Sequence, residues 1–455
     1  MRHTKLAIAA MALAVLAGCG GSSPEAGDQT VRVKFSSQVS FGDSLSDVGS
    51  YNVGTIAALK GGKFTINGDN TAINPTLTGR NWTELVAAQL GLPAPCAALT
   101  GLDGTAPGFN VPRKTNAGCY GYAQGGARVT NPVGPGNIAT GAATGFMTVP
   151  VVTQVANHLA AVGGKFKGDE LVLVMAGGND VLFLLSKLNA EATAAGNAAG
   201  AAAFFPSLIP QLASGATNPA TAAAAISSAV VAARNVAGAT QTMITQAAIG
   251  TAAQQPGNSG VLANAAAMVA KATADATAAG AKAGADYATA NGPALVTEMG
   301  KAGTELVALV KNQILANGAA YVTVNNLPDV ATTPSGRARS ADIRALIDTM
   351  VKAYNAALTS GLGSEQKVVI VDVYAVSHDQ ATTPAPYGLT NVSEPACDLS
   401  AAKNPIGSSI VCNGSNLVAG DISHYSFADE VHPTPYNNLL LARYVSRSLV
   451  IKGWL

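Results

Sequence analysis

The sequence is short of charge. Only 12% of its 455 residues are Asp, Glu, Lys or Arg, about half of the roughly 25% that soluble globular proteins carry. The 27 basic and 26 acidic residues nearly cancel and form no cluster of Lys and Arg. The chain therefore lacks the basic surface that nucleic-acid binding requires. Hydrophobic residues make up 48% of the chain, which excludes disorder driven by charge.

The N-terminus has the pattern of an export signal. Basic residues at positions 2, 3 and 5 precede an apolar run at 6–16, as in a secretory signal peptide. The run is shorter than the roughly 18 residues that a membrane-spanning helix needs. The Leu-Ala-Gly-Cys sequence ending at Cys19 resembles a bacterial lipoprotein box, in which the cysteine becomes the lipidated first residue. Cleavage by an ordinary signal peptidase is the alternative. We expect an exported protein, either secreted or associated with the outer membrane through Cys19, with 1–18 as signal peptide and 19–34 as tether.

The remaining cysteines are even in number, which in an exported chain favours disulfides. Three pairings are possible. The two pairs that are close in sequence would each close a short loop at modest entropic cost, and we expect these pairs. Zinc is the alternative, but Cys-x-x-Cys is absent and the spacings match no zinc finger. The expected pairs are Cys96 with Cys119 and Cys397 with Cys412.

Short apolar runs that alternate with helical patterns indicate an α/β fold. A parallel sheet with helices on both sides would place functional residues at the carboxyl ends of its strands. Expected strands lie at 31–41, 170–175, 322–327 and 368–376, and expected helices at 80–90, 149–162 and 435–449.

The composition changes between 187 and 300, where Ala dominates and charges are few. Ala is the best helix former, and interruptions by Gly and Pro predict several helices rather than one. We expect an inserted helical subdomain; a disordered low-complexity linker is the alternative. The insertion begins just after Asn179 and Asp180, so we expect either a lid over a neighbouring pocket or a remote decoration that packs on itself.

Three segments carry residues suited to nucleophilic chemistry. Ser44, in Gly-Asp-Ser-Leu, follows the first expected strand, and its hydroxyl would lie at the edge of the sheet. Asn179, in Gly-Gly-Asn-Asp, follows the second, and its amide can donate to an oxyanion. Asp429 precedes His432 by three residues, a spacing that lets the carboxylate orient the ring. Taken alone, the first segment is more typical of a helix cap and the second of an ordinary turn.

Spacing alone does not single out His432, because Asp421 precedes His424 by the same three residues. We favour His432 because it lies at the head of the terminal helix and is followed by Pro-Thr. His3, His158 and His378 have no acidic residue three positions earlier, and we expect structural roles for them.

The order of these segments resembles that of the GDSL family of SGNH hydrolases, which hydrolyse carboxylic esters. The resemblance implies a three-layer α/β/α flavodoxin-like sandwich, here with an Ala-rich helical insertion, in which Ser44 is the nucleophile, His432 the base and Asp429 the acid that orients it. A further family block corresponds to 121–126, where this chain has Gly in place of the usual Asn. That block implies Gly126, with Gly125 next, as an oxyanion donor beside the Ser44 amide and the Asn179 side chain. The hydrolase domain would comprise 35–186 and 301–455, on either side of the insertion at 187–300.

The expected function is hydrolysis of acyl or lipid esters by a serine esterase or lipase, without metal or organic cofactor. The alternatives are a polysaccharide acetyl esterase, a phospholipase or acyltransferase of the same fold, and a surface lipoprotein that only binds its ligand. The presence of Ser44, Asn179, Asp429 and His432 together argues against the last alternative. Gly-x-Ser-x-Gly, the nucleophile motif of the α/β-hydrolase fold, is absent from the sequence.

Overall fold

A parallel sheet forms the centre of the computed structural model, which describes residues 33–68 and 79–455. The predicted signal peptide and Cys19 lie outside these residues. In sheet order the four strands are β1 (Gln38–Gly42), β4 (Leu171–Met175), β5 (Tyr321–Asn325) and β6 (Val368–Val371). The strand at one edge of this sheet, β1, is joined on its free side by a further segment, in which Gly121 makes a parallel bridge with Ser40 of β1.

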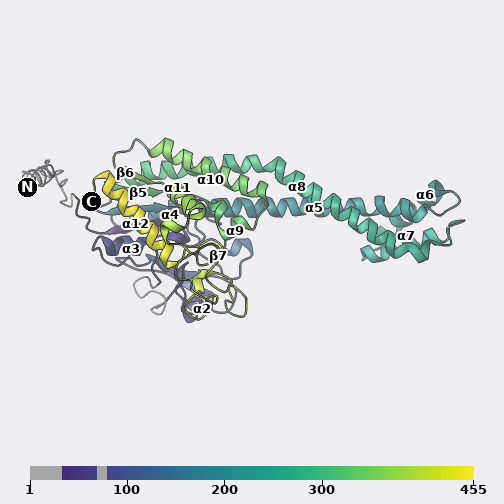
Figure 1. Ribbon diagram of the computed structural model, residues 1–455, viewed down its shortest axis with the longest axis horizontal. Helices are drawn as coiled ribbons and strands as arrows, with labels where there is room; N and C mark the ends of the chain where they lie inside the picture. Colours follow the sequence, from purple (N-terminus) through teal and green to yellow (C-terminus); the bar gives the residue numbers. More distant parts are fainter. Residues whose placement is uncertain (1–32, 69–78) are drawn as a thin grey trace, which may run out of the picture.

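Helices cover both faces of the sheet, which makes three layers (Figure 1). On β4, Val172 belongs to the hydrophobic core on one face, whereas Leu173 belongs to the core on the other. Burial on both faces explains why β4 is a continuous apolar run. One face carries α4 (Val151–Ala161), α10 (Ala341–Leu362) and the base of α8 (Val261–Leu309), and the other carries α3 (Trp82–Gln89) and α12 (Pro435–Lys452).

Two strand predictions differ from the structure by five residues or more at one end. The strand expected at 31–41 begins only at Gln38. The strand expected at 368–376 ends at Val371, because Asp372 accepts a hydrogen bond from the Ala375 amide and so caps a helix. The smaller elements are α2 (Gly54–Ala58), β2 (Leu99–Asp103), β3 (Asn110–Thr115), α9 (Pro334–Arg337), α11 (Val373–Thr382), β7 (Asn391–Pro395) and β8 (Tyr425–Phe427).

Two disulfides join the pairs that are close in sequence, Cys96 with Cys119 and Cys397 with Cys412. These are the pairings that the sequence analysis favours. Disulfides persist in oxidising compartments, so they fit an extracellular protein. The described residues contain no cluster of His, Cys, Asp and Glu that could hold a metal ion.

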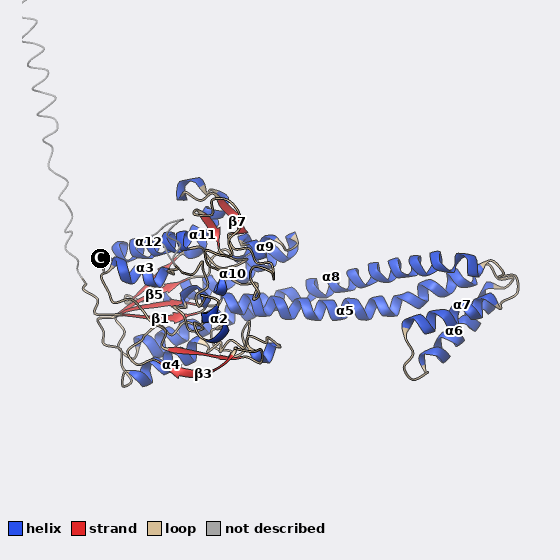
Figure 2. Cartoon of the chain, turned by 90° about the horizontal axis from the view of Figure 1, so that it is seen from below, coloured by secondary structure: helices blue, strands red, loops and turns tan. Residues whose placement is uncertain are grey.

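The Ala-rich segment is helical and forms a long arm (Figure 2). Its two long helices, α5 (Gly178–Ala213) and α8, pack against each other and carry the shorter α6 (Pro219–Arg234) and α7 (Gln241–Ala253) at the far end. The helices reach beyond the predicted insertion at both ends, because α5 already begins at Gly178 and α8 continues to Leu309. No helix within 33–68 and 79–455 is long and apolar enough to cross a membrane. The arm consists of α5, α6, α7 and α8.

Candidate active site

Ser44 lies where the order of the strands reverses. The chain pairs Gly121 on one side of β1 and places β4 on the other, and doubly wound sheets bind ligands at the carboxyl ends of strands beside such a reversal. A single 3₁₀ turn begins at Ser44, and Asp43 stabilises it by accepting the Leu45 amide at 3.1 Å. Only glycine fits at position 42, because a Cβ there would lie 2.1 Å from the Met175 carbonyl oxygen.

His432 connects Ser44 to Asp429. His432 Nε2 lies 2.8 Å from Ser44 Oγ, and His432 Nδ1 lies 2.8 Å from each oxygen of Asp429. The carboxylate also accepts the amides of Val431 at 3.0 Å, His432 at 2.8 Å and Ser409 at 2.8 Å. These bonds fix the imidazole with Nδ1 toward Asp429, which leaves Nε2 as the acceptor for the Ser44 hydroxyl proton.

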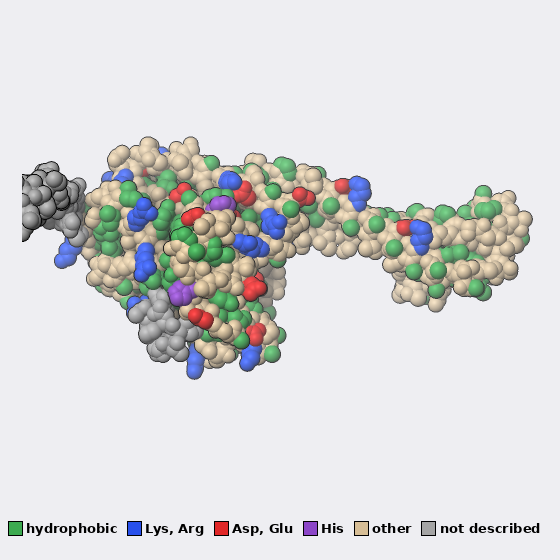
Figure 3. Space-filling view, in the orientation of Figure 1, with side chains coloured by type: hydrophobic (Ala, Val, Ile, Leu, Met, Phe, Trp, Pro, Cys, Tyr) green, Lys and Arg blue, Asp and Glu red, His purple; other side chains and the backbone are tan. Residues whose placement is uncertain are grey.

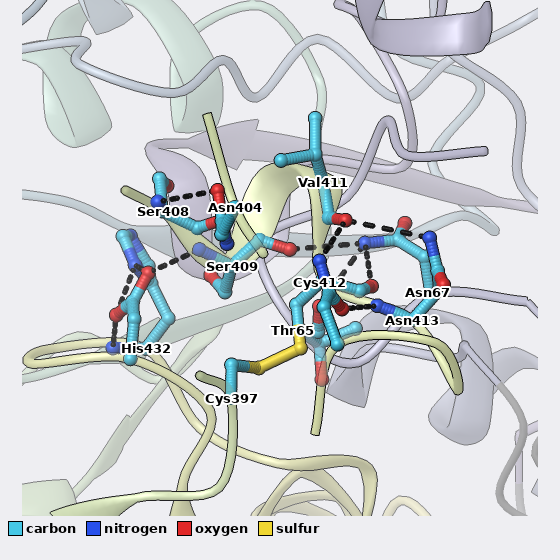
Figure 4. The surroundings of a disulfide bond; sticks show 12 residues. Thr65, Asn67, Cys397, Asn404, Ser408, Ser409, Val411, Cys412, Asn413 and His432 are labelled. Atoms are coloured by element: carbon cyan, nitrogen blue, oxygen red, sulfur yellow. Dashed lines mark hydrogen bonds and ion pairs between the residues drawn. A yellow bond between two sulfur atoms is a disulfide. The ribbon is translucent and has the colours of Figure 1, made fainter. Parts of the chain in front are cut away.

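Figure 4 shows how a disulfide supports this arrangement. Cys412 ends the short turn that supplies the Ser409 amide, and its bond to Cys397 closes the loop. The Asn67 side chain donates to the carbonyls of both Ser409 and Cys412 at 3.1 Å. The turn that holds Asp429 is therefore fixed by one covalent bond and by hydrogen bonds from a distant segment.

Burial and charge act against each other on the ionisable groups. Burial opposes ionisation of Asp429, but the adjacent His432 outweighs it and lowers the pKa of Asp429. Burial likewise opposes charge on His432, but Asp429, followed by Asp43, raises the pKa of His432 above its ordinary value. Asp43 is itself buried beside Ser44, and burial raises its pKa to about 7. The site thus favours a protonated imidazole once His432 takes a proton.

Three hydrogen-bond donors face the pocket beside Ser44. The amides of Ser44 and Gly126 have no acceptor among the described residues, and both residues line the pocket together with Asn179. Asn179 Nδ2 donates one hydrogen to the Ala127 carbonyl at 2.8 Å, which leaves its second hydrogen available. Gly126 has φ +78, and a Cβ there would lie 2.3 Å from the Pro135 carbonyl oxygen. Such a set of donors can stabilise a tetrahedral oxyanion.

Gly125, the second candidate of the sequence analysis, uses its amide elsewhere. It donates to Asp47 Oδ2 at 3.0 Å, while its carbonyl accepts the Tyr51 hydroxyl at 2.7 Å. Asp47 is fully buried and also accepts the Ser50 hydroxyl at 2.6 Å and the Gly49 amide at 2.9 Å. Asp47 was not among the residues predicted from sequence. A second acidic residue, three positions after Ser44 in the same short segment as Asp43, is the signal that could have found it.

The base of the arm binds the loop that follows Gly126. Asp180, at the start of α5, pairs with Arg128 at 2.8 Å and accepts the Val129 amide at 3.1 Å. Glu305, near the end of α8, accepts the Thr130 hydroxyl at 2.6 Å. Both long helices of the arm are therefore anchored beside the donors that face the pocket.

The pocket at Ser44 has a volume of about 280 Å³ and is mainly apolar. Among the described residues, no Lys or Arg lines it. None of its lining residues comes from 187–300, and the arm extends away from the body that contains the pocket (Figures 1 and 2). In this arrangement, 187–300 contributes no side chain to the pocket. The apolar lining includes Leu45, Phe64, Phe146, Leu182, Val376 and Leu441.

None of the other described histidines makes a hydrogen bond with Ser44. His424 Nδ1 contacts its neighbour Ser423 at 2.8 Å. His158 is buried among aromatic rings, and burial lowers its pKa to about 4. His378 Nδ1 lies 2.7 Å from Asp329 Oδ2. Because 49 positions separate these two residues, a spacing of three residues between an acid and a histidine does not reveal this pair.

Comparison with known proteins gives a distant relationship. No protein-family model matches the chain. A GDSL esterase/lipase of Arabidopsis thaliana is 24% identical over 141 residues, which cover 29% of this chain and 39% of that protein. The matched part of the chain thus spans well under half the length of this relative. The similarity supports a hydrolase of the GDSL family and carries no information on the substrate.

Proposed function

We propose that this protein is a GDSL-type serine ester hydrolase with the flavodoxin-like α/β/α sandwich of the SGNH hydrolases. Ser44 is the nucleophile, His432 the general base, and Asp429 the acid that orients it. The observation that carries the proposal is the continuous chain of 2.8 Å contacts from Ser44 Oγ through His432 to Asp429. A fully buried carboxylate, a histidine and a serine in this order are the arrangement that activates a hydroxyl for acyl transfer.

The reaction proceeds in two halves. His432 Nε2 takes the Ser44 proton as Oγ attacks the ester carbonyl, and the resulting oxyanion accepts bonds from the Ser44 and Gly126 amides and from Asn179. Each donor contributes on the order of 3 kcal/mol to the transition state. The protonated His432 then gives its proton to the departing alcohol, which leaves an acyl group on Ser44. Water, deprotonated by the same nitrogen, releases the acid and restores the serine.

The pocket favours an uncharged ester with an acyl chain longer than acetate. Its lining is mainly apolar, and the absence of Lys and Arg among the described lining residues leaves no partner for a phosphate. A volume of about 280 Å³ far exceeds the space that an acetyl group fills. These features favour a lipase or esterase over a polysaccharide acetyl esterase or a phospholipase.

Export and lipid attachment belong to the same proposal. The two disulfides support an extracellular location, whereas lipidation of Cys19 rests on the Leu-Ala-Gly-Cys sequence alone. Replacing Cys19 with Ser should release the protein from the membrane fraction of an expressing bacterium. Retention of the variant in that fraction would count against a lipid anchor.

Hydrolysis of p-nitrophenyl esters from acetate to palmitate, alongside a phospholipid and an acetylated polysaccharide, tests the function. We expect turnover to be greatest with chains longer than acetate and to fall at least 1,000-fold in Ser44→Ala and His432→Ala, as for other serine triads. His424→Ala is the matched control and should keep most of the activity. Unchanged turnover in purified Ser44→Ala would overturn the assignment of the nucleophile, and loss only in His424→Ala would overturn the choice of histidine.

A further inference from the structure

The outer part of the arm is almost free of charge. Between 192 and 270 the sequence contains a single charged residue, Arg234. The guanidinium carbon of Arg234 lies 4.9 Å from the centre of the Phe205 ring, so even this charge is engaged within the arm. Charged side chains are sparse on the arm and numerous on the sandwich in the view of Figure 3. The end of the arm therefore offers little to a partner that recognises charge.

The same region exposes large apolar side chains at the connection between α6 and α7. Val231 is 56% exposed, Val236 55% and Met243 50%, and we call these three residues the apolar turn. The end of the arm has its own core, in which Leu208 and Ile226 are fully buried. The residues of the apolar turn do not belong to this core.

The arm holds the apolar turn away from the sandwich. Helices α5 and α8 approach so closely that a Cβ on Gly280 would lie 2.8 Å from the Gly196 carbonyl oxygen. The two helices are therefore in direct contact along the arm. Figures 1 and 2 show α6 and α7 at the end of this pair, remote from the sheet.

Three kinds of partner differ in what they require. A stable contact with a protein or a second copy of this chain needs about 1,000 Å² of complementary surface, whereas the exposed large apolar side chains of the arm are few: Leu262, at the start of α8, and the three of the apolar turn. An anionic membrane is bound through clustered Lys and Arg, which 192–270 lacks. A fluid, uncharged lipid surface adapts its shape to single apolar side chains and needs no countercharge.

We propose that the apolar turn docks the protein onto the surface of an uncharged lipid or ester aggregate. Val231, Val236 and Met243 enter the apolar layer, and the arm links the sandwich to that surface. This function goes beyond the proposed hydrolysis and does not depend on it, because docking involves none of the residues around Ser44.

Flotation with triolein droplets coated with phosphatidylcholine tests the docking. All proteins carry Ser44→Ala, to prevent turnover, and Cys19→Ser, to prevent lipid attachment. The test variant combines Val231→Ser, Val236→Ser and Met243→Ser, and its bound fraction should fall at least tenfold. The matched control combines Val450→Ser and Ile451→Ser, which are 56% and 75% exposed on α12, and it should bind like the parent. Circular dichroism and Tm verify that the variants are folded.

Several outcomes would overturn the proposal. Equal flotation of the test variant and the control would remove the role of the apolar turn. Binding confined to phosphatidylglycerol vesicles and lost in 0.5 M salt would indicate an anionic membrane instead. Dimerisation that the test variant abolishes would identify a second copy as the partner. A wild-type protein that floats but hydrolyses no ester would contradict the proposed enzyme and leave the docking intact.

Discussion

His432 Nε2 lies 2.8 Å from Ser44 Oγ although 388 positions separate the two residues. Ser44 follows β1, whereas His432 precedes α12, which packs on the sheet with α3. Thr434 caps α12 by accepting the Asn437 amide, and the Thr65 hydroxyl donates to the Pro433 carbonyl at 2.9 Å. The turn at His432 is thereby held over the end of β1.

The pH dependence of hydrolysis should reveal the charge of Asp43. His432 must be neutral to accept the Ser44 proton, and because its pKa is raised, activity should be lost as pH falls through that raised pKa. Asp43→Asn removes a carboxylate whose ionised form raises the pKa of His432. Because burial raises the pKa of Asp43 itself to about 7, this charge is only partial near neutral pH. The acid limb of the pH profile of kcat/KM should therefore move to lower pH, by less than about one unit.

The control for this shift is Asp286→Asn, which removes an exposed carboxylate from α8. It should leave the acid limb in place. A limb that moves to higher pH in Asp43→Asn, or that moves equally in both variants, would contradict the role assigned to Asp43.

Asp47 should affect the rate through the oxyanion donors. Asp47→Ala removes the acceptor of the Gly125 amide, so the neighbouring Gly126 amide should lose its position. We expect kcat to fall about 10- to 100-fold with KM nearly constant. The affinity for a boronic acid, which mimics the tetrahedral intermediate, should fall in parallel, and this inhibition constant is the measurement.

Ser50→Ala is the milder control, because it removes one hydroxyl that donates to Asp47 and keeps the carboxylate. Its effect on inhibitor affinity should be small. If Asp47→Ala lowers Tm but leaves the inhibition constant unchanged, Asp47 stabilises the fold without positioning the donors.

The arm should not tolerate even a methyl group at Gly280. A Cβ there would lie 2.8 Å from the Gly196 carbonyl oxygen, whereas Gly300, on the same helix, has open space around it. Gly280→Ala should therefore lower the free energy of unfolding by about 1–2 kcal/mol. Gly300→Ala should raise it by up to about 1 kcal/mol, since Ala favours the helix.

Urea unfolding followed by circular dichroism compares the two variants. Hydrolysis of a soluble ester should stay unchanged in both, because neither glycine lines the pocket. Equal stabilisation by the two substitutions would show that α5 and α8 are not in close contact in solution.

The disulfide between Cys397 and Cys412 should support both stability and rate. It closes a loop over 15 positions, and its loss should cost about 3 kcal/mol. The Ser409 amide within that loop donates to Asp429, so replacing both cysteines with Ser should also lower kcat at temperatures where the variant is folded. Thermal melts and kinetics on the same sample separate the two effects.

The comparison is the variant with Cys96 and Cys119 replaced by Ser. That disulfide spans 23 positions and holds no bond to Asp429, so stability should fall while kcat changes less. Equal losses of kcat in both variants would argue against a specific link from the loop of Cys412 to Asp429.

Local sequence was sufficient for the central strands, for several of the helices and for most of the candidate site residues, but not for every strand end or for the smaller elements. The continuous apolar run of β4 predicted a strand buried on both faces, and the Ala-rich composition predicted helices between 187 and 300. Ser44, Asn179, Asp429 and His432 were named from short motifs, whose catalytic roles stay predictions. Motifs and periodicities are local because caps, turns and alternating burial involve neighbouring residues.

Only the tertiary structure decided which distant residues meet. The spacing of Asp421 and His424 equals that of Asp429 and His432, yet packing of α12 brings His432 alone to Ser44. The direction of the arm, the bond from Asp47 to the Gly125 amide and the pair of His378 with Asp329 were equally beyond local patterns. Sequence thus determined the elements and the chemistry available, whereas the packing of helices on the sheet determined which side chains lie within hydrogen-bonding distance.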